Sequence, residues 1–467
     1  MRKTKIVCTI GPASESEETL RALADAGMNV ARLNFSHGDY KEHGARIKRI
    51  KRMNRCLAHP IAILLDTRGP EIRTGKFEKD IKLKKGDTFI FRTKDSVDEE
   101  LGTTVTYAKL SSDVKKGDHI FVDDGMIEFE IIRIENEKIV CKVLNDGTLS
   151  SKKGLNIPGV DLHLPALAEK DIEDINFGIL HEVDFIAASF VKTRKDVVRI
   201  RKILDKKKSF ARIIAKIEHS TAVKNIDEII DSADGIMIAR GDLGLEIPFE
   251  EVPLVQAEIF GKCNLAGKPV ITATHMLNSM IDSPRPTRAE VSDVANSVLG
   301  GTDAVMLSAE TAKGKYPVES VKVLDKICKK ADGAVKPNFD TALRKGESVF
   351  EIVAHAVAQA AERMNAKAIL TFTSTGNTAC MLARYRSHVP VFAFTRNARI
   401  RKKLSLVWGA ESFELDKTSG TSDKMIANGI RALLENRRIK KGDTVVITAG
   451  ISVGKAGVTN MAEIRVV

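Results

Sequence analysis

The most constraining feature of this 467-residue chain is the repeated alternation of short apolar runs with segments of helical periodicity. Apolar runs of four to six residues are typical of parallel strands that are buried on both faces. Eight such runs occur, at 5–10, 29–35, 61–66, 185–190, 213–217, 235–239, 269–273 and 304–307. Eight parallel strands with helices between them, over roughly 250 residues, favour a (β/α)8 barrel. A doubly wound open sheet is the alternative.

The pattern changes between the third run and its helix. Residues 71–156 contain short alternating runs such as DTFIFRT and MIEFEIIRI, separated by KKGD and NDGT turn signals, with no helical period. We expect a small inserted β-barrel there. A third region after residue 338 mixes helical segments with apolar runs and predicts a C-terminal α/β three-layer sandwich. The predicted domains are 1–70 with 157–338, 71–156, and 339–467.

Composition limits the classes of partner. The chain has 74 basic and 62 acidic residues, giving +12 and a pI near 9.2. Its basic residues are scattered and aromatics make up only 5%, so acidic small substrates explain the surplus as well as nucleic acid does. Six cysteines without a CxxC spacing indicate reduced thiols. No run reaches the length of a membrane span. We expect a cytoplasmic protein with no nucleic-acid or membrane partner.

Polar residues recur where the predicted strands end. In the stretch 212–244, Lys216 and Glu218 share one strand face, and Asp242 lies between two glycines after the next strand. A single such pair would be read as a buried ion pair. The same pattern recurs at other strand ends, in Arg32, Asn34, Ser36, Asp66, Thr67, Thr272, Thr274, Ser308 and Glu310. Because active sites of such folds lie at the carboxyl ends of the strands, we expect one concave polar site.

The residue types indicate phosphoryl transfer. Glu218 and Asp242 offer hard oxygen ligands for Mg²⁺ or Mn²⁺, whereas histidine clusters suited to Zn²⁺ are absent from the sequence. Arg32, Arg73 and Lys216 supply fixed positive charge for phosphate or carboxylate oxygens. With no obvious nucleophile, positioning and electrostatics would carry the reaction. The segment GISVGK near the C-terminus has the wrong spacing for a P-loop.

At these residues the chain resembles the pyruvate kinase family over nearly its whole length. The resemblance is carried by long blocks in the family's order, namely KIVCTIGPAS, MNVARLNFSHG, ILLDTRGPEIRTG, IAKIEH, IMIARGDLG, PVITATHMLNSM and PRPTRAEVSDVANSVLGGTDAVMLSAETAKGKYP. It implies transfer of phosphate from phosphoenolpyruvate to ADP, giving pyruvate and ATP. It also implies the barrel, the β-domain after strand three, the C-terminal domain, and a homotetramer.

The resemblance also implies roles at the site. Glu218 and Asp242 are similar to the ligands of the divalent metal, and Lys216 to the cation that bridges the phosphoryl group and stabilises the enolate. The remaining implied contacts are Ala239, Arg240, Gly241 and Thr274 for the substrate carboxylate, Arg32 and Arg73 for phosphate, Thr274 and Ser308 for the water path that protonates the enolate, Asn34, Ser36, Asp66 and Thr67 for K⁺, and Pro12, His37, Arg73 and Lys153 for ADP.

Several positions qualify the resemblance. Glu71 is the residue type that accompanies K⁺ dependence in this family, so we expect K⁺ activation. His275 and Arg68 depart from the family's usual Gln and Lys without removing an essential charge. The loop Thr373, Ser374, Thr375, Gly376, Asn377 and Thr378 resembles a phosphate-binding effector loop. The loop associated with fructose bisphosphate is replaced by GISVGKAGVTN, so a phosphorylated effector and no allostery both stay open. A metal-dependent lyase or aldolase acting through a pyruvate enolate is the competing enzyme class, although it has no need for the inserted domain.

Overall fold

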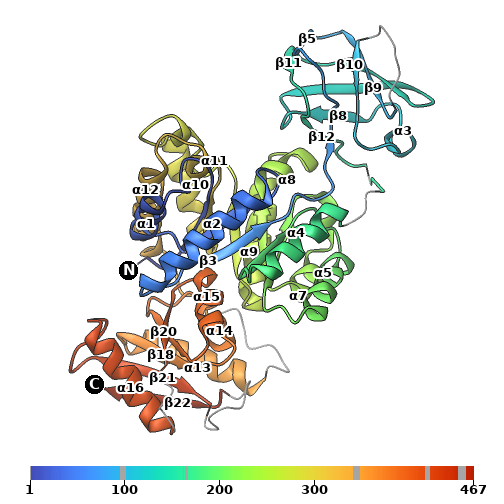
Figure 1. The fold of residues 1–467 in the computed structure, drawn as a ribbon. Coiled ribbons are helices and arrows are strands. Elements are labelled where there is room, and N and C mark those ends of the chain that lie inside the picture. Colours follow the sequence, from blue (N-terminus) through green and yellow to red (C-terminus); the bar gives the residue numbers. More distant parts are fainter. Residues whose placement is uncertain are drawn as a thin grey trace.

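The structure is a computed structural model that describes residues 2–94, 101–160, 162–163, 167–339, 348–415, 421–450 and 459–467. Its centre is a closed parallel barrel (Figure 1). The barrel strands are β1 (Lys5–Thr9), β2 (Val30–Asn34), β3 (Ala62–Asp66), β13 (Phe185–Ala188), β14 (Arg212–Ile217), β15 (Gly235–Ala239), β16 (Val270–Ala273) and β17 (Ala304–Leu307). Since β17 pairs with β1, the (β/α)8 barrel is confirmed and the open sheet is excluded.

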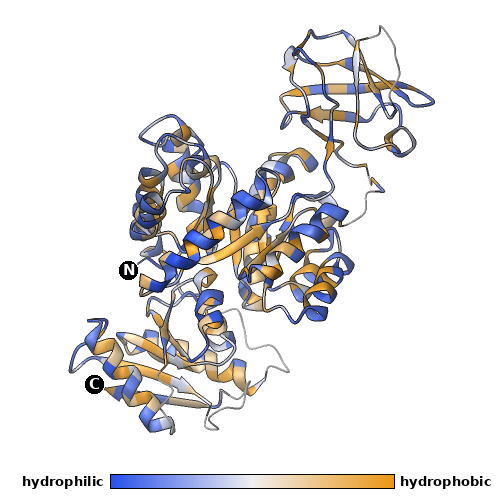
Figure 2. Cartoon of the chain, viewed as in Figure 1, coloured by the Kyte–Doolittle hydropathy of each residue, from blue (hydrophilic) through white to orange (hydrophobic). Residues whose placement is uncertain are grey.

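Helices cover the outside of the barrel, with polar faces toward solvent (Figure 2). The main ones are α1 (Glu17–Ala26), α2 (Tyr40–Met53), α4 (Glu169–Leu180), α5 (Arg194–Lys206), α7 (Ile226–Ser232), α9 (Val252–Ala266), α10 (Arg288–Leu299) and α12 (Pro317–Asp332). Side-chain caps fix several of their starts. Ser16 accepts from the N–H of Thr19, and Thr287 accepts from the N–H of Glu290 in a capping box.

Strand alternation divides the barrel residues into two sets. One set faces the helices, for example Ile6, Ile63 and Ile213. The other set fills the barrel interior and contains residues from all eight strands, including Val7, Val30, Leu64, Ala187, Ile214, Met237, Ile271 and Ala304. Successive side chains of a strand point to opposite faces, so every second residue continues along the interior.

The inserted domain is all β apart from the short helix α3 (Leu110–Asp113). Its larger sheet has the order β4-β12-β8-β9-β10-β6-β7. The strands are β4 (Ile72–Arg73), β6 (Thr88–Arg92), β7 (Gly102–Thr104), β8 (His119–Val122), β9 (Ile127–Glu135), β10 (Lys138–Val143) and β12 (Gly154–Asn156), and β5 (Ile81–Leu83) pairs with β11 (Gly147–Leu149). A bridge between Thr74 and Val105 brings the ends of the larger sheet together. The predicted small β-barrel is therefore present between β3 and α4.

The C-terminal domain is the predicted three-layer sandwich. Its sheet has the order β20-β19-β18-β21-β22. The strands are β18 (Ala368–Phe372), β19 (Val391–Thr395), β20 (Ala410–Glu414), β21 (Thr444–Ala449) and the antiparallel β22 (Met461–Val466). Helices α13 (Val349–Arg363), α14 (Asn377–Ala383) and α15 (Ala398–Lys403) pack on one face, and α16 (Ser422–Glu435) packs on the other. The exact domain boundaries stay predictions.

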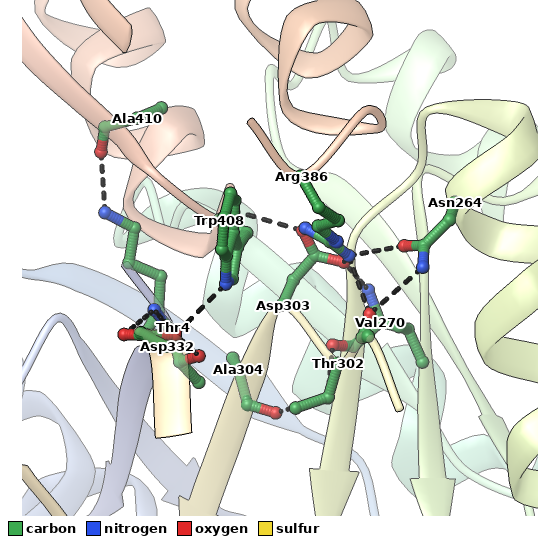
Figure 3. A network of polar contacts seen from close by, with 12 residues as sticks. Thr4, Asn264, Val270, Thr302, Asp303, Ala304, Asp332, Arg386, Trp408 and Ala410 are labelled. Atoms are coloured by element: carbon green, nitrogen blue, oxygen red, sulfur yellow. Dashed lines mark hydrogen bonds and ion pairs between the residues drawn. The ribbon is translucent and has the colours of Figure 1, made fainter. Parts of the chain in front are cut away.

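The C-terminal domain covers the edge of the barrel where the strands begin (Figure 3). Asp303, which precedes β17, accepts hydrogen bonds from Arg386 (Nη1, 3.0 Å) and from the backbone N–H of Trp408 (3.2 Å). Leu406, in the 3₁₀ turn η3 (Leu404–Leu406), is fully buried in the same cluster as the barrel interior. This end of the barrel is thus closed by an apolar side chain. In the described residues no helix is both long and apolar enough to cross a membrane.

Candidate active site at the carboxyl ends of the barrel strands

The interior of the barrel changes from apolar to polar along the strands. On five strands an apolar interior residue is followed two residues later, and on two of them also four residues later, by a polar one. This gives the successions Val7 to Thr9, Val30 to Arg32 and Asn34, Leu64 to Asp66, Ala187 to Ser189, and Ile214 to Lys216 and Glu218. The polar groups therefore gather at the carboxyl ends of the strands, at the opposite end from Leu406.

Lys216 is the centre of this polar layer. Its Nζ lies 2.8 Å from Glu218 Oε1 and 3.1 Å from Asp66 Oδ1, and it donates a hydrogen bond to Ser189 Oγ at 2.8 Å. Asp66 and Glu218 are almost completely buried, with side chains 1% and 2% exposed. The lysine is held between two carboxylates that water scarcely reaches.

Arg32 is fixed by the same carboxylate. Its Nε donates to Asp66 Oδ2 at 2.6 Å, and its Nη1 donates to Thr9 Oγ1 at 2.9 Å. The Arg32–Asp66 and Lys216–Asp66 contacts use different oxygens of Asp66. One carboxylate thus orients two cations toward the end of the barrel.

The electrostatics follow from this arrangement. Burial works to raise the pKa of Asp66, but Lys216 and Arg32 outweigh it and hold that pKa below the ordinary value. Burial works to lower the pKa of Lys216, but Asp66 and Glu218 raise it above the ordinary value. Lys216 is therefore a permanent cation and cannot serve as a general base near neutral pH.

Glu218 and Asp242 form the candidate metal site. Asp242 lies in the first turn of the short helix α8 (Arg240–Glu246), which follows β15. Burial, followed by the charge of Glu218, raises the pKa of Asp242 well above that of an ordinary carboxyl. A buried and a half-buried carboxylate that repel each other are a donor set that a divalent cation would stabilise. The described residues contain no group of three His, Cys, Asp or Glu side chains suited to a metal, so two carboxylates would leave positions for substrate and water.

The candidate K⁺ residues lie on neighbouring strands. Asn34 of β2 is directly opposite Asp66 of β3 in the sheet register. Asn34 Oδ1 accepts from the N–H of Ser36 at 3.1 Å, and the carbonyl of Asp66 accepts from the N–H of Phe35 at 3.0 Å. Thr67 follows at the end of β3, where its carbonyl accepts from Ser189 Oγ at 2.6 Å. These oxygen donors are the type that an alkali cation needs.

Thr274 is held in a strained backbone conformation. Both Thr274 and His275 have positive φ values, 68° and 55°, and this is unusual for a β-branched threonine. Thr274 Oγ1 accepts from the N–H of Gly241 at 2.9 Å. Arg240 is fastened by two contacts of 2.7 Å to Asp293 and donates to the Thr274 carbonyl at 2.8 Å. Strain of this kind is found where surrounding structure fixes a residue for function.

A third strained residue supports the metal ligand. Phe190, after β13, has a φ of 53°, and its N–H donates to Glu218 Oε2 at 2.7 Å. Its ring lies against Gly69, where a Cβ atom would come within 2.5 Å of the ring. Gly69 is therefore required for this packing, and the packing aims the Phe190 N–H at Glu218.

Ser308 lies at the end of β17 and is positioned by Glu310. The N–H of Ser308 donates to Glu310 Oε2 at 2.8 Å, and the N–H of Leu277 donates to Glu310 Oε1 at 3.1 Å. Glu310 thus ties the segments after β16 and β17 together. Thr272, by contrast, points away from the interior and is bonded to Thr302 Oγ1 at 2.9 Å. Including Thr272 with the polar strand ends was wrong, because its side chain faces the helices.

The candidate nucleotide residues are spread over both sides of the junction with the inserted domain. Arg73 contacts Glu71 (Nε to Oε2, 2.8 Å) and the carbonyl of Lys152, and Glu71 also pairs with Arg68 at 3.4 Å. Lys153 pairs with Asp123 at 2.9 Å. Pro12 and His37 are exposed on the barrel loops. Burial, followed by the charge of Arg73, lowers the pKa of His37. Pro12 and His37 are therefore open to solvent, whereas Arg73 and Lys153 are already paired within the inserted domain.

The candidate effector loop is at the end of β18. It is far in sequence from the polar layer around Lys216, which we call the catalytic layer. Gly376, with φ 84°, donates its N–H to Thr373 Oγ1 at 2.9 Å. Thr375 and Asn377 both accept from Lys403 Nζ, at 2.9 and 3.0 Å. Thr378 Oγ1 bonds to Thr459 Oγ1 at 3.0 Å, and the side chain of Ser374 is exposed. Most of the neighbouring GISVGKAGVTN segment, residues 451–458, lies outside the described residues.

Sequence reasoning missed two side chains of the catalytic layer, Ser189 and Thr9. Ser189 accepts from Lys216, and Thr9 accepts from Arg32. Strand alternation was the signal that could have found both, since each lies two residues after an apolar interior residue.

The family models that match the chain are "Pyruvate kinase, barrel domain" over residues 1–321 and "Pyruvate kinase, alpha/beta domain" over residues 351–465. Similar proteins named pyruvate kinase include those of Bacillus licheniformis, 50% identical, and Geobacillus stearothermophilus, 49% identical. Each match covers 100% of this chain and about four fifths of the relative (81% and 80%). The pyruvate kinase of Clostridium acetobutylicum is 44% identical over 100% of both chains.

Proposed function

The chain belongs to the pyruvate kinase family, and we propose that this phosphotransferase moves the phosphoryl group of phosphoenolpyruvate to ADP through an enolate of pyruvate. The observation that carries the proposal is the position of Lys216. Its ammonium group is held by Asp66, Glu218 and Ser189 beside the candidate metal ligands. A permanent cation at that place can stabilise negative charge both on the phosphoryl oxygens and on the enolate oxygen.

Glu218 and Asp242 would hold Mg²⁺ or Mn²⁺, and Asn34, Ser36, Asp66 and Thr67 would hold K⁺. When bound, these cations supply positive charge that neutralises the phosphoryl oxygens during transfer. The fit rests on the chemistry of the donors, which are hard oxygens, and on their mutual repulsion: burial, followed by the charge of Glu218, raises the pKa of Asp242.

Arg32 and Lys216 orient the substrate phosphate. Arg32 keeps Nη2 available while Nε and Nη1 are used by Asp66 and Thr9. Because both cations are anchored by one buried carboxylate, their positions are set before substrate arrives. Such preorganised charge lowers the barrier without reorganisation at the moment of transfer.

The start of α8 is suited to the substrate carboxylate. The first N–H groups of a helix lack partners within the helix and attract anions. Here they belong to the segment of Ala239, Arg240 and Gly241, which the Arg240–Asp293 pair holds in place. Thr274 Oγ1 and Ser308 Oγ would then carry the proton, through water, to the enolate carbon.

The inserted domain would act as a lid over the nucleotide. Arg73 and Lys153 of this domain, with Pro12 and His37 of the barrel, would contact ADP. Closing such a lid excludes water and so favours transfer to ADP over hydrolysis. Glu71, beside Arg73, would set the response to K⁺. We further propose a homotetramer and a phosphorylated effector at 373–378, which sedimentation with and without sugar phosphates would test.

The function is tested by measuring pyruvate released from phosphoenolpyruvate and ADP with Mg²⁺, once in K⁺ and once in Na⁺. We expect pyruvate in K⁺ and little in Na⁺. Equal rates would keep the kinase and contradict the role of Glu71. Folded protein that releases no pyruvate in either salt would contradict the proposal and favour the lyase.

A further inference from the structure

A second large cleft lies at the end of the barrel opposite the active site. It has a volume of about 680 Å³, which is within the usual range of small-molecule sites. One wall is formed by the barrel, from the end of α2, the segment before β13 and the turn between α5 and β14. The other wall is α15 of the C-terminal domain. The cleft therefore spans two domains and shares no residue with the catalytic layer.

The lining of this cleft is strongly basic. Nine lysine and arginine side chains line it against two carboxylates, Glu182 and Asp184. Glu182 is shared between Lys51 (3.6 Å) and Arg399 (3.3 Å), and Asp184 pairs with Lys402 (3.3 Å). Arg212 and Arg401 pair with Asp234 (3.0 Å) and Glu414 (3.7 Å), which lie outside the lining. Nine cations against four carboxylates leave an excess of five positive charges. We call this cleft, which is lined by residues between 51 and 60, 179 and 184, 207 and 212, and 397 and 403, the basal cleft.

Three cations of the basal cleft are unpaired among the described residues. The side chains of Arg55, Lys207 and Lys208 are exposed and make no hydrogen bond or ion pair among the described residues. Like charges that converge on a concave surface repel one another, and concave walls focus their field. Such a surface is stabilised by an anion.

Deeper in the cleft the cations are partly desolvated. Arg401 has a buried Nε atom without a hydrogen-bond partner, although its Nη2 group donates to the carbonyl of Ala58. Burial lowers the pKa of Arg401 and of Lys403. Lys403 donates only to neutral oxygens, those of Thr375 and Asn377. Arg401 has one carboxylate nearby, Glu414 at 3.7 Å, and Lys403 has only neutral hydrogen-bond partners.

An exposed aromatic ring completes the lining. Phe210, in the turn between α5 and β14, is 65% exposed. The Arg399 guanidinium lies over its ring at 4.0 Å. This stacking holds a cation of α15 against the barrel wall, so both walls present positive charge to the same space.

We propose that the basal cleft binds a small molecule with two or more phosphate groups, which bridges the barrel and the C-terminal domain. A single phosphate would contact only one wall, whereas a polyphosphate can engage Lys207 and Lys208 on one side and Arg399 on the other. This site is distinct from the 373–378 loop. The two are adjacent only through Lys403, which lines the cleft and donates to Thr375.

The test is calorimetric titration of the full chain with inorganic tripolyphosphate and, separately, with inorganic phosphate. The variant Lys207→Ala/Lys208→Ala removes two unpaired charges of the barrel wall, and Arg399→Ala removes the cation of α15 that pairs with Glu182. The matched control is Lys84→Ala/Lys85→Ala, which removes an equally exposed lysine pair in the inserted domain, outside the cleft. None of these residues belongs to the catalytic layer.

We expect tripolyphosphate to bind much more tightly than phosphate. The Lys207→Ala/Lys208→Ala variant should weaken this binding about tenfold, since it removes two exposed charge contacts of the barrel wall. Arg399→Ala should weaken it several-fold, and the control should leave it unchanged. Equal loss in the control would show non-specific attraction to a basic protein and overturn the site. An unchanged Arg399→Ala variant, or phosphate that binds as tightly as tripolyphosphate, would overturn the bridging ligand.

Discussion

The substitution Lys216→Met tests the role of the central cation. In the folded protein the ammonium group is within 2.8 Å of Glu218 and 3.1 Å of Asp66, and both carboxylates are buried. Without it, Asp66 keeps Arg32 as a partner, whereas Glu218 keeps, among the described residues, only the N–H of Phe190. Breaking a buried ion pair costs about 3–5 kcal/mol, because a charge is left without compensation. We expect a loss of stability of that size.

The loss of turnover should be larger than the loss of stability explains. Removing one preorganised electrostatic contact costs about 10²–10³ in rate, and Lys216 faces the charge that develops during transfer. We therefore expect turnover to fall by more than about 10³ in protein that circular dichroism shows to be folded. The assay is pyruvate formation at saturating substrate and metal, at a temperature well below the unfolding midpoint of the variant.

The matched control is Lys5→Met. Lys5 is also a buried lysine of a barrel strand, but it lies at the opposite edge and donates to the carbonyl of Ala410 at 2.6 Å. Burial lowers its pKa to about 8, whereas the adjacent carboxylates raise the pKa of Lys216. Turnover of this variant should stay near wild type. A Lys216→Met variant that keeps near-normal turnover, or a Lys5→Met variant that loses as much, would refute the reasoning.

Three further predictions concern the cation response, pH and the domain junction. Glu71→Lys should relax the K⁺ requirement, because a fixed cation would replace the carboxylate beside Arg73; an unchanged K⁺-to-Na⁺ ratio of turnover would contradict this. Burial raises the pKa of Glu246 from 4.5 to about 7, so the folded state loses stability as the pH rises between these values, by roughly 3 kcal/mol. Glu246→Gln should flatten that slope, and an identical pH dependence of the unfolding midpoint would count against it. Leu406→Ala should cost about 2–5 kcal/mol, measured by urea unfolding through the single tryptophan, Trp408, and no shift in midpoint would be inconsistent with its burial in the barrel interior.

Much of the fold could be predicted because strands that are buried on both faces appear in the sequence as continuous apolar runs. All eight barrel strands are apolar runs, and helices between them such as α1 and α5 are amphipathic. Their periodicity is strong because one face of each helix must cover the barrel. The closing of the sheet could only be favoured from the number of strands. It is settled by the pairing of β1 with β17.

The elements that the sequence did not predict, α8 and β20, lack a clear apolar run or helical periodicity. Helix α8 contains two glycines in RGDLGLE, a composition that disfavours helix, and it forms at the end of a barrel strand where Arg240 is fastened to Asp293. Strand β20 is short and mixes buried with half-exposed residues. In both cases tertiary contacts decide the local structure, and a single sequence does not display those contacts.

The candidate site also contains residues that the sequence pattern places correctly and residues that it does not. Alternation correctly places Lys216, Asp66 and Arg32 on the interior, and a strict use of it would have added Ser189 and Thr9. It fails after β16, where Thr274 adopts a left-handed conformation and no longer follows the parity of Thr272. The position of Phe190 also depends on a left-handed residue. Strain of this kind comes from the assembled barrel and is invisible to periodicity.

The most direct test of the central claim follows the phosphorus atom itself. Phosphoenolpyruvate labelled with ³²P is incubated with ADP, Mg²⁺, K⁺ and the full chain, and the products are separated. If Lys216 and Arg32 position the phosphoryl group for transfer to ADP, the label appears in the terminal phosphate of ATP at the same rate as pyruvate forms. Label that appears only as inorganic phosphate, or that stays on an intact substrate while folded enzyme is present, would contradict the account.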